Sequence, residues 1–492
     1  MHYPTLFIVM IHRVLLWNRC SLPSCIGVYA ICCFFPSSVI AEDWPTFQLD
    51  NQRSGITSEH IDVPLHCQWV LTPRQKPHAA WEESPAKQDF WQGFKNLKPR
   101  SLFDRANYVS IAGNRIFFGS SSDDMICCRD LESGEERWVF FMEGPVRFAP
   151  TLYEGKVYSG SDDGSVYCLD AEDGKLIWKY NPFPNKHLII GNGRMISACP
   201  IRTSILVQNR IVYFCAGIFP LEGVYLCALH TSDGSVLWQK TMSDSPQGYL
   251  LSTTENLFIP TGNTNPLVYG MESGSKLGSF SQGRSGGTYA IIVDNKIVSG
   301  PGYTESGSDW LNTFDTDSHA RVASFQGNHV IVTDSFSYLH TDDRLTAIDR
   351  DRYFKANARE VELENRSKEI REKLKKLDKN TETMQMTSFI DELTTIQEEI
   401  TRNVEEKNAS VLWAVSCAHP YSLIATDTLL FAGGDNEVAA YQKSDGAILW
   451  KGEVTGQAYG LAVSERSLLV STDQGTIHRF SEGSSVPKWQ SY

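Results

Sequence analysis

The sequence predicts an all-β fold, an eight-bladed β-propeller, and two observations carry that prediction. A glycine is followed four residues later by a tryptophan at positions 134–138, 174–178, 234–238 and 446–450. Around each pair, short apolar runs alternate with Ser, Asp and Gly turns. Runs joined by tight turns are typical of antiparallel hairpins, and a unit repeated about every 40 residues is typical of a propeller blade.

Each unit predicts a four-stranded antiparallel meander that ends at its tryptophan. In the unit that ends at Trp178, Gly174 supplies the positive φ of the last turn, and the indole can lie flat against the next blade. The blades are expected at 108–138, 146–178, 196–238, 246–280, 286–325, 327–413, 417–450 and from 454 onward. Gly278 and Ala323 stand where the fourth and fifth tryptophans would be.

The eighth unit lacks a closing strand, and the N-terminal region offers one. Residues 65–71 have the pattern of a lone closing strand with Trp69 near its end. If this strand completes the eighth blade, the ring is closed by its own N-terminus and no edge remains open. The structural tryptophans of this scheme are Trp69, Trp138, Trp178, Trp238, Trp413 and Trp450. A seven-bladed ring is the alternative, if the weak fourth and fifth units are miscounted.

Residues 355–408 interrupt the sixth blade with a helical periodicity. The segment is charged, lacks Gly and Pro, and has a polar break at 378–383. Its apolar stripes are Leu363, Ile370, Leu374 and Leu377, then Phe389, Leu393, Ile396, Ile400 and Val404. They predict an antiparallel coiled-coil hairpin of two helices, each of about 22 residues and about 33 Å long. This arm is either a passive insertion or a surface for partner docking or oligomerisation.

The first 41 residues predict a secretory signal peptide. They hold Arg13 and Arg19 but no acid, then an apolar stretch at 25–35 and the small-residue pattern Val39-Ile-Ala41. The protein is therefore expected to be exported, to the periplasm or outside the cell, and an uncleaved membrane anchor is the alternative. The expected organisation is signal peptide 1–41, lead-in and closing strand 42–105, blades one to six 106–354, helical insertion 355–408, and the remaining blades 409–492.

Charge and cysteine content exclude several classes of function. The formal net charge is −13, which argues against nucleic-acid binding because an acidic surface repels phosphate. Eight cysteines lie beyond residue 41, without CxxC spacing or a metal-like cluster, so they are expected to be buried apolar groups. No nucleophile–base pair, phosphate loop or HExxH-like motif occurs, so no metal site is predicted and nothing supports hydrolysis.

The repeat of residues 155–178 resembles that of pyrroloquinoline quinone (PQQ) propellers, over almost the whole chain outside the signal peptide and helices. Residues 44–55 resemble the lead-in of secreted PQQ-like propellers common in planctomycete bacteria, as do 193–197, 216–220 and 245–249. The resemblance implies the fold and two classes of function. One is the quinoprotein dehydrogenase, which oxidises alcohols or aldoses with PQQ and calcium. The other is the outer-membrane assembly factor, a periplasmic propeller that binds proteins without a cofactor.

Three features favour the second class. Dehydrogenases of this kind often stack PQQ on a disulfide between adjacent cysteines, but Cys127 and Cys128 lie within one strand, where neighbouring side chains point to opposite faces. Asp123, Asp124, Asp162 and Asp163 occupy repeated turns, where aspartates are expected to cap the backbone. The chain is also shorter than those enzymes. We therefore expect a non-catalytic binding or scaffold protein without a cofactor. The alternatives are a PQQ- and calcium-dependent dehydrogenase, or a propeller paired with a separately encoded enzyme.

Candidate ligand-binding residues follow from the propeller geometry, because the first strand of each blade lines the channel and the loop before it rims one mouth. They are Arg147, Arg194, Gln247, Tyr249, Arg284, His419, Gln457 and Tyr459. Such groups suit an anionic or polar ligand, or they bond neighbouring blades and channel water. Protein partners are expected on a propeller face or on the arm.

Overall fold

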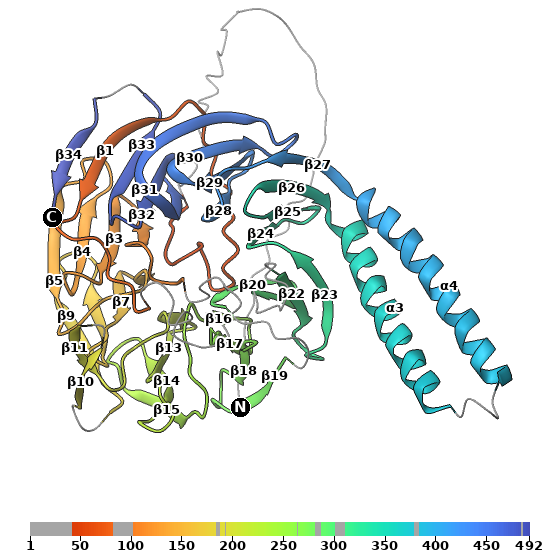
Figure 1. Ribbon diagram of the computed structural model, residues 1–492. Coiled ribbons are helices and arrows are strands. Elements are labelled where there is room, and N and C mark those ends of the chain that lie inside the picture. Colours follow the sequence, from red (N-terminus) through yellow and green to blue (C-terminus); the bar gives the residue numbers. More distant parts are fainter. Residues whose placement is uncertain are drawn as a thin grey trace, which may run out of the picture. The chain divides into compact units, whose positions relative to one another are not determined.

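Four-stranded antiparallel sheets that follow one another in chain order dominate the structure, a computed structural model of the 492-residue chain (Figure 1). It describes residues 42–81, 102–183, 187–191, 193–262, 264–280, 287–300, 310–377, 383–483 and 486–492, all within one compact unit. The prediction of an all-β propeller is confirmed. In the described part of the chain, no helix is long and apolar enough to cross a bilayer.

Six sheets are simple meanders of four consecutive strands. The first holds β2 (Val109–Ala112), β3 (Arg115–Ser120), β4 (Met125–Asp130) and β5 (Glu136–Phe141), and the second β6 (Thr151–Tyr153), β7 (Lys156–Gly160), β8 (Val166–Asp170) and β9 (Leu176–Tyr180). The third holds β12 (Leu206–Gln208), β13 (Ile211–Ala216), β14 (Tyr225–His230) and β15 (Val236–Thr241), and the fourth β16 (Leu251–Ser252), β17 (Asn256–Ile259), β18 (Leu267–Gly270) and β19 (Lys276–Ser279). The fifth holds β20 (Tyr289–Val293), β21 (Lys296–Gly300), β22 (Trp310–Asp315) and β23 (Arg321–Gln326), and the sixth β24 (His329–Val332), β25 (Phe336–His340), β26 (Arg344–Asp349) and β27 (Val411–Ser416).

The remaining strands form one combined sheet, because β31 (Ile448–Ser464) is long enough to pair with β30 through its first part and with β32 through its last. Its order is β28 (Ser422–Ala425), β29 (Leu429–Gly433), β30 (Asp435–Gln442), β31, β32 (Ser467–Thr472), β33 (Ile477–Ser481), β1 (His66–Thr72) and β34 (Lys488–Ser491). The N-terminal strand β1 thus lies antiparallel to β33 and parallel to β34. The sequence pattern did not predict β34.

A β-bulge precedes the tryptophan position in every closing strand named here. In the second sheet, Ile177 is skipped in the register with β8, so Trp178 pairs with Cys168. The same skip occurs in β1, β5, β15, β19, β23, β27 and β31. Because a bulge increases the local twist and re-aims side chains, it turns the indole toward the next sheet.

Each tryptophan of the repeat donates its indole N–H to a carbonyl of the next unit, and five of the six also pack on a glycine there. Trp138 packs on Gly174, where an added Cβ would lie 2.6 Å from the indole, and its Nε1 donates to the Ala171 carbonyl at 3.2 Å. Trp178 repeats this against Gly234 and Thr231. Matching indole donations come from Trp69, Trp238, Trp413 and Trp450. The glycine is therefore required both for its positive φ and for the space that the ring occupies.

The two places without a tryptophan are filled differently. Gly278 occupies the tryptophan position of the fourth sheet, and the next turn carries His319 instead of glycine, at φ +57°. A Cβ on Gly278 would lie 2.9 Å from the His319 ring, so the bulky and small residues have exchanged sides. At Ala323, the tryptophan position of the fifth sheet, a cavity of about 40 Å³ remains. Tyr353 and Phe354 of helix α3 (Arg350–Lys376) line it.

Two helices, α3 (Arg350–Lys376) and α4 (Thr383–Asn408), separate β26 from β27. Asp349 ends β26 and caps α3 by accepting from the Arg352 N–H at 3.0 Å. Its own N–H donates to the Ser410 carbonyl at 2.9 Å, as the Asp170 N–H does to Lys175 in the second sheet. The two helices are therefore inserted at the end of the β26–β27 hairpin, which keeps the closing hydrogen bond of the other sheets.

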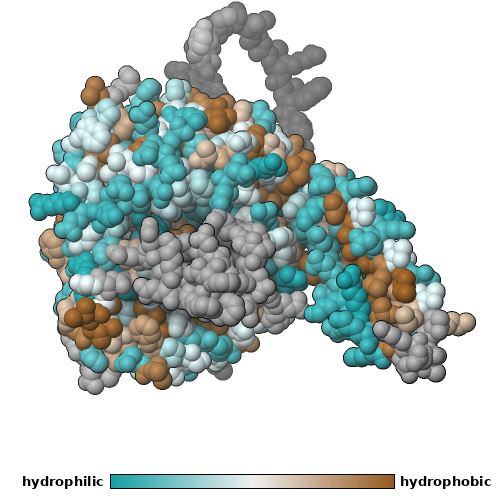
Figure 2. All heavy atoms as spheres, viewed as in Figure 1, coloured by the Kyte–Doolittle hydropathy of each residue, from teal (hydrophilic) through white to brown (hydrophobic). Residues whose placement is uncertain are grey.

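The apolar stripes of the helices face each other, with one correction. Leu363, Ile370 and Ile396 form the core between α3 and α4. Val404 was expected in the same stripe but is 41% exposed, and Asn403 is buried instead. The Asn403 amide donates to the Ala356 carbonyl at 2.9 Å, which satisfies a buried polar group. Figure 2 shows further apolar side chains on the surface of this arm; exposed ones on α4 include Met384 and Ile390.

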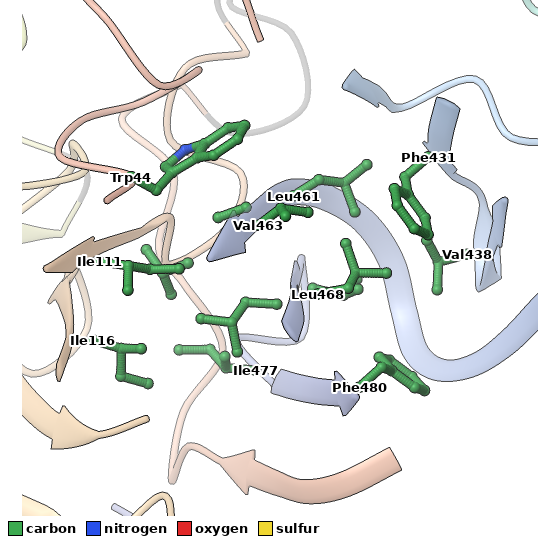
Figure 3. Close-up of a cluster of buried hydrophobic side chains, with 14 of the residues drawn as sticks. Trp44, Ile111, Ile116, Phe431, Val438, Leu461, Val463, Leu468, Ile477 and Phe480 are labelled. Carbon is green, nitrogen blue, oxygen red and sulfur yellow. The ribbon is translucent and has the colours of Figure 1, made fainter. Parts of the chain in front are cut away.

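Residues 44–57 cross the innermost strands of the propeller. Trp44 exchanges two backbone hydrogen bonds with Ile111 and is fully buried in the cluster that joins the first sheet to the combined sheet (Figure 3). Later residues of the segment bond, in chain order, to Leu152 of β6, Val207 of β12, Ser252 of β16, Ile292 of β20 and Ala425 of β28. The segment thereby ties together inner strands that are far apart in sequence.

Candidate functional site

Arg147, the first of the predicted site residues, lies in a buried cluster of ion pairs, called here the closed node. Arg147 bonds Asp162 at 2.7 Å and Asp104 at 2.9 Å, and Arg202 bonds the two oxygens of Asp162 at 2.8 and 3.0 Å. All four side chains are buried, and Asp104 also accepts from the Ala80 N–H. Nearby carboxylates raise the pKa of Arg147 against the effect of burial. This node joins the second sheet, the loop before the third and the segment before the first.

The expectation for Asp162 was wrong, because it does not cap its turn. Asp163 takes that role and accepts from the Ser165 N–H at 2.7 Å. Asp162 is fully buried between two guanidinium groups, where its charge is compensated. Arg202 and Asp104 were missed by the sequence analysis, since neither stands at a repeated turn.

Gln247 and Tyr249 lie in an aromatic layer under this node. Tyr249 is buried, stacks on Phe47 at 3.9 Å between ring centroids and meets Phe148 edge-on at 5.1 Å. Its hydroxyl accepts from the Ala149 N–H, and Gln247 Oε1 accepts from the Trp81 indole. Phe47 belongs to the crossing segment 44–57, so the layer packs directly on that segment.

Arg194 does not join this group. Arg194 lies on β11 (Arg194–Ser197), which pairs with β10 (Leu188–Gly191) in a separate hairpin. Its guanidinium bonds Asp124 and the Ser121 carbonyl of the first sheet. Arg284 lies outside the described residues.

His419 belongs to a chain of buried polar groups between β25 and β30. Its Nδ1 lies 2.7 Å from the Tyr441 hydroxyl and its Nε2 2.8 Å from Glu437. The Tyr441 hydroxyl also contacts the Cys417 sulfur at 3.3 Å, and that sulfur lies 3.5 Å from His340 Nε2. Burial lowers the pKa of His419 and lowers that of His340 to about 3, so both rings are neutral at pH 7.

Gln457 and Tyr459 lie in a second node, which is open. Asp435 accepts from the Tyr421 hydroxyl at 3.0 Å and from the Gln457 amide at 2.9 Å. The Tyr459 hydroxyl donates to Gln457 Oε1, and the Tyr421 and Tyr459 rings lie 4.9 Å apart. Asp435 is exposed, and a second carboxylate, Asp473, accepts from the Gln457 N–H at 2.7 Å.

The two nodes are built on the same repeat position. Asp162 follows β7 and binds Arg147, four residues before the inner strand β6, and Arg202, four residues before the next inner strand, β12. Asp435 follows β29 and binds Tyr421, directly before the inner strand β28, and Gln457, within β31. In the first node two guanidinium groups neutralise the carboxylate, whereas in the second the donors are uncharged. The open node therefore presents negative charge beside two aromatic rings, and it suits a cationic group rather than the anion that the arginines suggested.

Comparison with known proteins places the chain in a family. The family described as "Outer membrane protein assembly factor BamB" matches residues 80–352 and 397–492, which is most of the chain. The chain belongs to this family. It is a PQQ-like propeller.

More distant similarities agree on the fold. The quinohemoprotein alcohol dehydrogenase of Comamonas testosteroni is 12% identical with a TM-score of 0.55, over 90% of this chain and 82% of that one. A europium-containing methanol dehydrogenase is 10% identical with a TM-score of 0.55, over 90% and 98%. Tetrathionate hydrolase of Acidithiobacillus ferrooxidans is 28% identical over 138 residues, which are 26% of this chain and 25% of that protein.

The resemblance to quinoprotein dehydrogenases implies sites for PQQ and calcium. Within the described ranges, no three His, Cys, Asp or Glu side chains come together as a metal site. The carboxylates of the closed node, Asp104 and Asp162, are paired with the Arg147 guanidinium group. Cys127 and Cys128 are free thiols that point into different clusters, and burial raises the pKa of Cys127 to about 11. The described residues therefore do not form the donor set or the disulfide platform of those enzymes.

Proposed function

We propose that this member of the BamB-described family is an exported, eight-bladed, PQQ-like propeller that acts as a non-catalytic binding or scaffold protein. In this proposal β1 closes the ring, and the arm of α3 and α4 belongs to blade six. The observation that carries the proposal is that the channel is occupied by the protein's own residues, namely the crossing segment 44–57, the aromatic layer and the closed node. A catalytic propeller needs that space for its cofactor and substrate.

We place the partner-binding surface at the open node of Asp435 and Gln457. Tyr421 and Tyr459 offer aromatic faces, and the carboxylates of Asp435 and Asp473 lie beside them; among the described residues, neither carboxylate forms an ion pair with a guanidinium group. A lysine or arginine side chain of a protein partner fits this chemistry through ion pairing and cation–π contact. The family description, an assembly factor, supports a protein as the partner.

A PQQ- and calcium-dependent alcohol or aldose dehydrogenase remains the second candidate. The alcohol and methanol dehydrogenases of similar fold favour it. Their identities of 12% and 10% carry the fold alone, and the described residues do not reproduce a calcium site or a cysteine platform.

One experiment separates the two candidates. The protein lacking residues 1–41 is titrated with PQQ and calcium, and dye reduction is followed with a panel of alcohols and aldoses. We expect neither saturable binding nor turnover. Saturable PQQ binding accompanied by alcohol-dependent dye reduction would overturn the proposal.

A second titration tests the open node directly. A short oligolysine peptide is titrated by calorimetry at low salt, where ion pairing is least screened. We expect Asp435→Asn to weaken binding about tenfold, the effect of one lost charged contact of about 1.4 kcal/mol. Asp317→Asn, an exposed aspartate in the β22–β23 turn, is the matched control and should bind like the unaltered protein. Equal binding by all three proteins would refute the site.

A further inference from the structure

Glu59 is a buried carboxylate that joins three separate parts of the chain. It is 8% exposed, and its side-chain oxygens accept from the Glu465 N–H at 3.2 Å and the Arg466 N–H at 3.0 Å, in the turn between β31 and β32. Its backbone carbonyl accepts from the Asp427 N–H at 3.3 Å. These N–H groups are neutral, and a buried carboxylate without a countercharge is costly in a protein interior.

The third N–H donor to the Glu59 carboxylate comes from the beginning of the described chain. The backbone N–H of Glu42 donates to Glu59 Oε1 at 2.9 Å. The Glu42 side chain is turned the other way, where it accepts from the Thr57 hydroxyl at 2.6 Å and the Ser58 N–H at 3.0 Å. Two residues later, Trp44 is fully buried. Residue 42 is therefore held from both sides with its nitrogen directed at the carboxylate.

No positive group among the surrounding described side chains is paired with the Glu59 carboxylate. The charged or titratable side chains nearby are those of Glu42, His60, Asp62, Asp427, Glu465 and Arg466. The Arg466 guanidinium bonds Glu482 at 2.7 Å and lies 3.7 Å from Asp62, and His60 lies between Asp62 and Asp427. The positive groups are thus engaged with other acids, and the set as a whole is acidic.

We propose that Glu59 is the docking site for a new N-terminus, created when the chain is cleaved between Ala41 and Glu42. Hydrolysis by a signal-processing peptidase consumes one water, breaks the Ala41–Glu42 peptide bond, and leaves a carboxylate on Ala41 and an α-ammonium on Glu42. The nitrogen that already lies 2.9 Å from Glu59 then carries a positive charge. Processing thereby locks the crossing segment 44–57 onto the turn of the combined sheet. This inference rests on the proposed export, but not on the proposed binding role.

The proposal predicts a stability difference that depends on pH. A free α-amino group has a pKa of about 8, and pairing with a buried carboxylate raises that pKa in the folded state. The added stability is therefore fully present below about pH 8 and is lost as pH rises through the folded-state value. The hydrogen bond with Asp427 raises the pKa of His60 above its ordinary value, and because every variant compared shares His60, its contribution cancels.

The test compares two forms of the protein that differ in the position of the N-terminal charge. One begins at Glu42, released from a fusion whose protease leaves no extra residue, and the other begins with Gly-Ala before Glu42, which keeps the N–H but moves the charge away. We expect the first to melt roughly 1–3 °C higher at pH 7, with the difference disappearing above about pH 10. Glu59→Gln should abolish the difference at pH 7.

A chemical readout does not depend on melting. Acylation of the α-amino group at pH 7 should be at least tenfold slower in the Glu42 form than in its Glu59→Gln variant, because an ion-paired ammonium is not nucleophilic. Two results together would overturn the proposal. They are equal acylation rates in the Glu42 form and its Glu59→Gln variant, and equal melting temperatures in the Glu42 form and the Gly-Ala form. Export and cleavage are checked separately, by N-terminal sequencing of protein recovered from the periplasm. The outcome of the docking test is therefore independent of whether the protein binds PQQ or the oligolysine peptide.

Discussion

The smallest unit of this fold is a contact between one tryptophan and one glycine, and its two partners come from neighbouring sheets. The indole lies on the glycine and donates to the carbonyl three residues before it, as Trp138 does to Ala171 beside Gly174. Spacing alone predicted the tryptophan and glycine, because each is fixed by its own hairpin. The exchange between Gly278 and His319 could not be predicted in this way, since it pairs residues of two different repeats.

Gly174→Ala should destabilise the protein more than Gly155→Ala. Both glycines have φ +71°, so both variants carry the same backbone strain of about 1 kcal/mol. At Gly155 an added Cβ meets nothing within 4 Å, but at Gly174 it would lie 2.6 Å from Trp138. We therefore expect Gly174→Ala to lose about 1–3 kcal/mol more, measured as the shift in urea midpoint. Equal shifts would show that the ring yields without cost.

At the scale of elements, the end of a β-hairpin in this fold accepts either a short turn or a pair of helices. Asp349 ends β26 as Asp170 ends β8, yet one begins a helix and the other a four-residue turn. The helical periodicity of residues 355–408 was visible in the sequence. The start of α3 at Arg350 was not, because Asp349 has the local sequence of an ordinary turn and only the downstream residues make it a helix cap.

The arm can be replaced by the turn of the second sheet. We expect a chain in which Ala171–Gly174 stands in place of residues 350–409 to fold, since the bond from Asp349 to Ser410 is retained. It should be less stable, because Tyr353 and Phe354 no longer cover the cavity at Ala323. Ala323→Trp in that chain should recover stability by about 1–3 kcal/mol, read from thermal melts. Failure of the tryptophan to help would mean that the fifth sheet cannot accept the repeat contact.

The pairing of α3 with α4 depends on one face of α4. Ile396→Asp places a charge in the buried seam with Leu363 and Ile370, and we expect a loss of helical circular dichroism. Val404→Asp is the matched control, because Val404 is exposed. Tryptophan fluorescence should stay unchanged in both variants. A similar helix loss in both would contradict the assignment of the buried face.

At the scale of the whole molecule, the crossing segment 44–57 unites strands that local sequence cannot relate. Arg53 is fully buried and donates to the carbonyls of Leu250, Phe47 and Asp50 and to the Thr46 hydroxyl. Burial lowers the pKa of Arg53 to about 10, so it stays charged at pH 7. Nothing in the repeat pattern indicated that residues before the first blade would lie inside the propeller.

Arg53→Met should therefore act on the molecule as a whole. It leaves several buried carbonyls unpaired, and we expect a loss of about 3–5 kcal/mol in the free energy of unfolding. Arg210→Met, which removes an exposed arginine in a surface ion pair with Glu154, should cost about 0–1 kcal/mol. Urea unfolding followed by tryptophan fluorescence measures both. A small effect of the Arg53 change would mean that the segment is dispensable.

Acid should destabilise the protein through its buried histidines. Burial lowers the pKa of His329 and His478 to about 4 and of His340 to about 3, below the ordinary value of 6.5. Below pH 6.5 the unfolded chain binds protons that the folded chain does not, so stability falls until the folded-state pKa is reached. Between pH 7.5 and pH 5 each histidine should contribute a loss of about 2 kcal/mol. His478→Gln should reduce this acid sensitivity, whereas the exposed His66→Gln should leave it unchanged.

The sequence by itself determined the propeller class, the tryptophan–glycine contacts and the presence of helices. Each of these depends on a periodicity within a few tens of residues, which local patterning records. The tertiary structure alone decided which turn aspartates are neutralised. Asp162 and Asp435 occupy one repeat position, but the first meets Arg147 and Arg202 and the second meets Tyr421 and Gln457. The charge of a carboxylate is set by the groups that folding places around it, and those groups lie up to tens of residues away.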